Sequence, residues 1–202
     1  SKHRLLEIAQ VTQNIFRQLQ DKGILESYEV ETGRLNTAQS PVVPQNTLNP
    51  AQQKAFEEIK EAFTHKNVTL LHGVTSAGKT EIYIHLITEY LRRGKQVLYM
   101  LPEIALTKQT IERLRRVFGN RIGLYHSKFS DAERVEVWKK QQGNEPYDII
   151  LGVRSSLFLP FHNLGLVIID EEHENSYKQQ EPAPRYNARN AAIVLASFFG
   201  AK

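Results

Sequence analysis

A pattern that binds phosphate lies between residues 73 and 80. The segment GVTSAGKT matches G-x-x-x-x-G-K-[ST] and stands directly between a predicted strand and a predicted helix, which is the context this pattern requires. Glycines at both ends let the backbone N–H groups point inward at phosphate oxygens, and the N-terminus of the following helix adds its positive dipole. Lys79 is expected to reach the β- and γ-phosphates, and Thr80 to ligate Mg²⁺. The predicted ATP-binding loop therefore consists of Gly73, Val74, Thr75, Ser76, Ala77, Gly78, Lys79 and Thr80.

A second chemical group follows an apolar run, where LVII ends in Asp-Glu-Glu-His at residues 170–173. Carboxylates at the mouth of a buried strand are costly unless a cation compensates them. In an open parallel sheet, ligands lie beyond the carboxyl ends of the strands, so this group is expected at the same edge as the phosphate loop. Asp170 is predicted to hold the Mg²⁺ shell, and Glu171 to accept a proton from the attacking water or to orient it. An acidic helix cap would explain the acidity but not the pairing with a phosphate loop. The two patterns together indicate a nucleoside triphosphatase.

The elements that must position these residues alternate from residue 51 onward. Apolar runs that are continuous, separated by helical patterns, predict an α/β fold: a RecA-like lobe with a mostly parallel sheet and helices on both faces. Glycines 94 and 119 are predicted helix stops, and Ser130 with Glu133 forms a predicted capping box. The predicted strands cover 67–72, 96–101, 121–125, 147–151 and 164–170, and the predicted helices cover 51–63, 79–93, 107–118, 130–142 and 188–199.

Two further zones precede this lobe. Residues 1–35 hold short helical patterns and an alternating segment with a Thr-Gly turn, the element order of the C-terminal half of a winged helix. A helical strut packed on the next domain is the alternative interpretation. Residues 36–50 carry no charge and several prolines, which predicts a semi-rigid linker. The predicted division is thus 1–35, 36–50 and 51–202.

Composition excludes several classes of protein. The chain has 202 residues, a formal net charge of +4 and no cysteine, so it has no disulfide framework and no thiolate metal site. The longest apolar run, at 191–201, is far shorter than the ~20 residues of a membrane span. The N-terminus has no apolar signal-peptide region, and it lacks an initiator Met, which suggests a piece cut from a longer chain. We expect a soluble, intracellular protein without a membrane partner.

Six sequence blocks carry a family resemblance. LNPAQQ, GVTSAGKTE, LPEIALTKQ, LYHSKFSDAER, GVRSSLFLPF and DEEHENSYKQQE stand in the order found in bacterial replication-restart helicases, the primosomal protein N′ (PriA) family. The chain resembles this family over roughly residues 48–202. The resemblance implies the first lobe of a superfamily 2 DNA helicase that hydrolyses ATP, with Mg²⁺, to move 3′ to 5′ along single-stranded DNA in replication restart and primosome assembly. The implied partners are single-stranded and forked DNA, single-stranded-DNA-binding protein and other primosome proteins, in the bacterial cytoplasm at the nucleoid.

The resemblance also assigns residues outside the phosphate loop. Gln52 matches the glutamine that contacts the adenine edge, although it also stands where a capping partner of Asn49 is expected. Thr107 lies at a helix N-terminus whose backbone amides can meet a DNA phosphate. Arg154 and Ser155 match a second block of phosphate contacts.

Residues 176–189 match an aromatic-rich loop that couples DNA binding to hydrolysis in this family. Tyrosine side chains can stack on unpaired bases, and cations can meet phosphates. A surface loop whose tyrosines pack locally is the alternative. Two features depart from the family pattern: the Pro-Ala-Pro step at 182–184, and the asparagines at 187 and 190. The residues assigned to DNA binding or coupling here are His173, Tyr177, Lys178, Arg185, Tyr186 and Arg189.

The resemblance places a second motor lobe with an arginine finger, and a cysteine-rich zinc module, beyond Lys202. Because an arginine finger contributes about 10³–10⁵ in rate, this chain alone is expected to bind ATP weakly and to hydrolyse it negligibly. One alternative is a winged-helix DNA-binding module beside a nucleotide-gated regulatory lobe. Another is a P-loop kinase or GTPase, but the N-K-x-D motif by which GTPases recognise guanine is missing from the sequence.

Overall fold

The computed structural model describes residues 14–15, 18–19, 22–24, 43–74 and 77–202. The chain divides into two compact units, Ser1–Arg34 and Leu35–Lys202. In the first unit, residues 14–15 and 18–19 are helical, and Gly23 turns the chain with φ +68°. The predicted hairpin of the partial winged helix and the linker up to residue 42 lie outside the described residues. The second unit carries the predicted chemistry.

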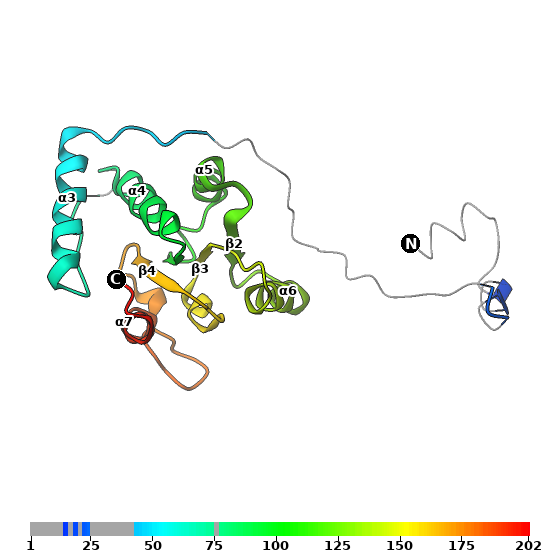
Figure 1. The fold of residues 1–202 in the computed structure, drawn as a ribbon. Helices are drawn as coiled ribbons and strands as arrows, with labels where there is room; N and C mark the ends of the chain where they lie inside the picture. Colours follow the sequence, from blue (N-terminus) through cyan, green and yellow to red (C-terminus); the bar gives the residue numbers. More distant parts are fainter. Residues whose placement is uncertain (1–13, 16–17, 20–21, 25–42, 75–76) are drawn as a thin grey trace. The chain divides into compact units, whose positions relative to one another are not determined.

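The second unit contains a four-stranded parallel sheet with the order β2-β3-β1-β4. Figure 1 shows strands of this sheet with helices on either side of them. All residues of β1 and β3 are buried, because helices cover both faces of the sheet. The predicted parallel α/β fold is therefore confirmed. The strands are β1 Gln96–Met100, β2 Ile122–Tyr125, β3 Ile149–Gly152 and β4 Leu164–Ile169.

The helices begin and end at the signals that the sequence provides. Asn49 caps α3 with Pro50 as its first residue, Thr107 caps α5, and Ser130 caps α6 in a capping box. Left-handed glycines follow α4 and end α7. The described helices are α3 Pro50–His65, α4 Lys79–Arg92, α5 Lys108–Phe118, α6 Asp131–Gln142 and α7 Ala188–Phe199, with 3₁₀ turns η1 Gly119–Arg121, η2 Arg154–Phe158 and η3 Asn175–Tyr177.

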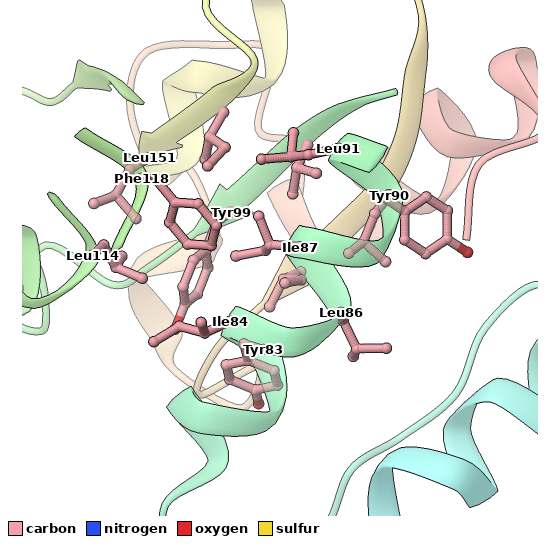
Figure 2. Close-up of a cluster of buried hydrophobic side chains, with 14 of the residues drawn as sticks. Tyr83, Ile84, Leu86, Ile87, Tyr90, Leu91, Tyr99, Leu114, Phe118 and Leu151 are labelled. Atoms are coloured by element: carbon pink, nitrogen blue, oxygen red, sulfur yellow. The ribbon is translucent and has the colours of Figure 1, made fainter. Parts of the chain in front are cut away.

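Two apolar cores lie on opposite faces of the sheet. Alternate side chains of β1 divide between them: Val97 and Tyr99 join the core under α3, α4 and α5, whereas Leu98 and Met100 join the core under α6 and α7. Figure 2 shows the first core, where side chains of α4 pack toward the ring of Tyr99. Both cores fix the C-terminal ends of β1 and β4 at one edge of the sheet.

The predicted strand at 67–72 is not formed. Val68 and Leu70 are 56% and 70% exposed, and the segment has no strand hydrogen bonds. It lies beside β4 across a cavity of about 550 Å³, which is also lined by α7. The backbone of Lys202 takes part of the edge of β4 instead: its N–H donates to the Gly165 carbonyl (3.0 Å) and its carbonyl accepts from Val167 (2.8 Å). β propensity depends strongly on the pairing and packing that the rest of the fold offers. The apolar residues of 67–72 are therefore not sufficient to add this segment to the sheet. Among the described residues, no helix has the length and apolar character needed to cross a membrane.

Candidate active site

The acidic group lies at the C-terminal end of β4, as predicted. Asp170 follows the last strand residue, and residues 171–173 form a turn in which Glu171 adopts φ +47°. The Glu174 N–H donates to the Glu171 carbonyl at 2.9 Å and closes this turn. The next helical element is the short 3₁₀ turn η3, so an acidic cap on an α-helix does not explain this group.

The phosphate loop meets the acidic group at the same edge. Gly78 stands in the left-handed conformation (φ +78°) immediately before α4, which brings Lys79 to the first helical position. The Lys79 Nζ donates to the Gly73 carbonyl (2.8 Å) and lies 3.5 Å from Glu171 Oε1. Thr80 occupies the first turn of α4, whereas the predicted loop residues Thr75 and Ser76 lie outside the described residues. Two segments almost a hundred residues apart thus form one charged site.

Asp170 is held from two sides. Its Oδ2 accepts a hydrogen bond from the Tyr99 hydroxyl and its Oδ1 accepts one from the Glu171 N–H, both at 3.1 Å. Burial raises the pKa of the Asp170 carboxyl above its ordinary value, and the Glu171 charge adds to this effect, while the Tyr99 hydrogen bond opposes it. Burial, together with the charge of Asp170, also raises the pKa of Tyr83 and Tyr99.

The donor set at this edge fits a magnesium nucleotide. A carboxylate and a hydroxyl are the hard oxygen ligands that Mg²⁺ prefers, and this metal usually combines one or two protein ligands with substrate phosphates and water. Among residues that the structure describes, no group of three or more His, Asp or Glu side chains forms a protein-only metal cage. Asp170 and Thr80 would hold the metal, and Lys79 with the loop amides would hold the phosphates. When bound, the metal supplies positive charge that stabilises the phosphoryl oxygens.

Gln52 connects α3 to the phosphate loop. Its Oε1 accepts from the Asn49 N–H (3.0 Å) and its N–H donates to the Asn49 side chain (2.9 Å), so the predicted alternative, a capping box, is confirmed. Its Nε2 donates to the Gly78 carbonyl at 3.3 Å. A Cβ at position 78 would lie 2.3 Å from this nitrogen, so a larger residue would displace the end of the Gln52 side chain, and the positive φ of Gly78 itself favours glycine. An adenine contact by Gln52 stays a prediction.

The prediction that Tyr177 stacks on bases is wrong. Its side chain is 1% exposed, and its hydroxyl donates to the Asp170 carbonyl (2.7 Å) and the Met100 carbonyl (3.1 Å). The 3₁₀ turn η3 directs the ring into the core beneath β1 and β4, where no base can reach it. Tyr186 is half-buried and meets Phe158 edge-to-face, with ring centroids 5.2 Å apart. Phe158, in the same sequence block as Arg154 and Ser155, is 58% exposed.

Three residues that were predicted to contact DNA phosphates form contacts within the chain: Arg154, Lys178 and Arg185. Arg154 donates to the Lys178 carbonyl (3.3 Å), and Lys178 donates to the Arg185 carbonyl (2.5 Å). Arg185 pairs with Glu181 at 3.2 Å. These contacts brace residues 176–187 as a compact loop, which agrees with the alternative of a locally packed surface loop.

The remaining assigned residues lie at the same edge or on neighbouring elements. Arg189 pairs with Glu172, and His173 lies 3.8 Å from the Glu171 carboxylate while staying 69% exposed. Thr107 accepts from the Thr110 N–H (3.2 Å) as an ordinary N-cap. Ser155 is half-buried in η2.

Comparison with known proteins places this site in a family. The family model described as DEAD/DEAH box helicase matches residues 49–197, which include the phosphate loop and the Asp-Glu-Glu-His group. The chain belongs to the DEAD/DEAH box helicase family. This membership agrees with the resemblance found in the sequence blocks.

Curated relatives narrow the comparison within the DEAD/DEAH box helicases. Replication restart protein PriA of Haemophilus influenzae is 44% identical over 191 residues, covering 90% of this chain and 26% of that protein. The PriA proteins of Bacillus subtilis and Rickettsia prowazekii are 46% and 49% identical, covering 74% of this chain and 18% and 23% of their own lengths. The chain therefore spans about a quarter or less of these relatives. The expected resemblance to the PriA family is confirmed for this lobe.

A solved structure gives a more distant match. The ATP-dependent Type ISP restriction-modification enzyme LlaBIII bound to DNA aligns over 79% of this chain and 12% of its own, with a TM-score of 0.49 and 17% identity. This likeness is too distant to support an argument about function.

Proposed function

We propose that this chain is the ATP-binding lobe of a bacterial DNA helicase that acts in replication restart. The observation that carries the proposal is the 3.5 Å approach of Lys79 to Glu171, beside Asp170, at the carboxyl edge of a parallel sheet. Relatives named replication restart protein PriA, at 44–49% identity, support it. In the whole protein, ATP hydrolysis with Mg²⁺ drives movement 3′ to 5′ along single-stranded DNA.

The partners follow from the same family. Single-stranded and forked DNA are the proposed substrates, and single-stranded-DNA-binding protein and other primosome proteins are proposed partners in the bacterial cytoplasm. The alternative, a DNA-binding winged helix with a regulatory nucleotide lobe, is less well supported, because the family match begins at residue 49. Zinc is proposed only for the cysteine-rich module that the family resemblance implies outside this chain.

Each residue of the site has a proposed task in hydrolysis. Lys79 leaves the Gly73 carbonyl and Glu171, and its ammonium stabilises charge on the β- and γ-phosphates. Glu171 then accepts a proton from the attacking water or orients it. Asp170, whose oxygens are already oriented by hydrogen bonds, would hold the metal together with Thr80. β4 and α7 form apolar walls of the adjoining cavity, which Lys79, Asp170 and Glu171 also line.

The test compares Lys79→Ala and Glu171→Gln in the full-length protein. Lys79→Ala should weaken nucleotide binding and lower ATP-driven unwinding by at least about a hundredfold, because the phosphates lose their cation. Glu171→Gln should preserve nucleotide binding while lowering turnover by about 10²–10⁴. Lys54→Ala, on the exposed face of α3, is the matched control and should change neither. Equal losses of nucleotide affinity in the two site variants would show that their roles are misassigned.

A further inference from the structure

The Asp170 carboxylate accepts a hydrogen bond from a buried tyrosine, Tyr99. Tyr99 is the last but one residue of β1, is 1% exposed and is surrounded by apolar side chains of the core. A phenol at such a position needs a partner, because burying an unpaired hydroxyl costs about 1–3 kcal/mol. Its partner is Asp170 Oδ2, at 3.1 Å across the β1–β4 pair.

The ring of Tyr99 has little freedom to turn away. Tyr83 of α4 packs against it edge-to-face, with ring centroids 5.6 Å apart and planes at 75° (Figure 2). The strand beneath it pairs with β3 on one side and β4 on the other, so its backbone is also fixed. These contacts keep the Tyr99 hydroxyl beside Asp170 Oδ2.

The two oxygens of Asp170 are thereby distinguished. Oδ1 accepts the Glu171 N–H, and Oδ2 accepts the Tyr99 hydroxyl, so rotation of the carboxylate would break both bonds. Each oxygen keeps lone-pair capacity, because a carboxylate offers about four acceptor sites. Second-shell donors of this kind orient metal ligands, and their removal typically costs about 10–100-fold in metal affinity.

We propose that Tyr99 is a positioning residue for the metal site, whose hydroxyl fixes the Asp170 carboxylate in the orientation that receives the cation of the magnesium nucleotide. The inference rests on the proposed function, because it assumes that this edge binds a metal with its nucleotide. It goes beyond the family assignment, because the phosphate loop and the acidic group would both be present with any apolar residue at position 99.

The test measures binding of a fluorescent N-methylanthraniloyl-ADP to this chain, once with Mg²⁺ and once with EDTA. The ratio of the two affinities is the magnesium coupling. Tyr99→Phe removes the hydroxyl and keeps the ring, so the coupling should fall by about tenfold. The affinity measured in EDTA should stay unchanged, because the phosphate loop is intact. Tyr90→Phe, a buried phenol near the other end of α4, is the matched control and should keep the coupling of the original chain.

A second variant tests whether the loss of coupling comes from the missing hydroxyl or from altered packing of the core. Tyr99→Met also lacks the hydroxyl and fills the core with an adaptable side chain, so it should lose the coupling to the same extent. An unchanged coupling in Tyr99→Phe, or a loss of affinity that is equal with Mg²⁺ and with EDTA, would overturn the inference. If the original chain binds the nucleotide under neither condition, the proposed function fails first, and the inference fails with it.

Discussion

The two halves of the proposed nucleotide site are built very differently. On the acidic side, β4 pairs with β1 along its length, and the Asp170 backbone and side chain accept hydrogen bonds from Tyr177 and Tyr99. On the phosphate side, residues 67–72 have no ladder partner, and Val74 is 77% exposed. The metal-binding half is therefore fixed by the fold itself, whereas the phosphate-binding half depends on Lys79, Gln52 and the start of α4. Preorganisation in this site is concentrated on the acid side.

The strongest test of this contrast is Tyr177→Ala. The ring is fully buried and its hydroxyl ties the ends of β1 and β4 together, so its loss should lower the free energy of unfolding by about 3–5 kcal/mol. Urea denaturation followed by circular dichroism measures the change. Tyr186→Ala, which truncates a half-buried ring in the same segment, should cost less than half as much. Similar costs for the two variants would show that η3 does not anchor the acidic side.

A second pair of variants compares the two flanking segments directly. Ile168→Ala in β4 removes a side chain that is 6% exposed and should cost about 2–4 kcal/mol. Leu70→Ala removes one that is 70% exposed and should cost about 0.5 kcal/mol or less. Urea unfolding of both variants gives the values. A large cost for Leu70→Ala would mean that residues 67–72 pair as a strand in solution, as the sequence predicted.

A third prediction concerns the response to ligand. Magnesium ADP at a hundred times its dissociation constant should raise the free energy of unfolding by about 2.7 kcal/mol. Hydrogen exchange should show that the added protection of backbone amides is larger at residues 67–74 and 77–80 than in β1 or β4, which are already paired. Protection confined to β4 would reverse the assignment of the two halves.

The smallest expected effect compares two glycines. Gly78→Ala and Gly94→Ala share the cost of a positive φ, about 1–2 kcal/mol. Only Gly78→Ala also displaces Gln52, since an added Cβ at Gly94 meets no atom within 4 Å. The extra cost at position 78 should be about 1 kcal/mol, the value of the lost hydrogen bond. Paired unfolding measurements resolve the difference, and equal costs would show that Gln52 does not support the loop.

Local patterns predicted most of the fold. The caps at Asn49, Thr107 and Ser130 and the continuous apolar strands depend on nearest neighbours in sequence, so the helices and four of the five expected strands were placed within a few residues. The strand at 67–72 failed because its formation depends on a hydrogen-bonding neighbour, which no local pattern specifies.

The candidate site likewise contains residues that the sequence placed correctly and residues whose roles it did not indicate. Lys79 and Glu171 were predicted to share one edge because motif order and parallel topology determine that edge, and the ion pair confirms their proximity. The roles of the tyrosines were not predictable. A tyrosine in a strand is equally compatible with an apolar core and with a donor to Asp170, and the burial of Tyr177 follows from a short 3₁₀ turn with no sequence signature.

The internal partners of Lys79 have a consequence for ligand selection. Because its ammonium already contacts the Gly73 carbonyl and the Glu171 carboxylate, a lone anion entering the loop would take the lysine from Glu171 and leave that acid uncompensated. A divalent cation that binds without phosphates would place its charge close to the Lys79 ammonium, which lies beside Glu171. A magnesium nucleotide brings both signs of charge together and would offer its phosphates to Lys79 and its metal to the acids, so we expect the resting ion pair to favour it over free phosphate.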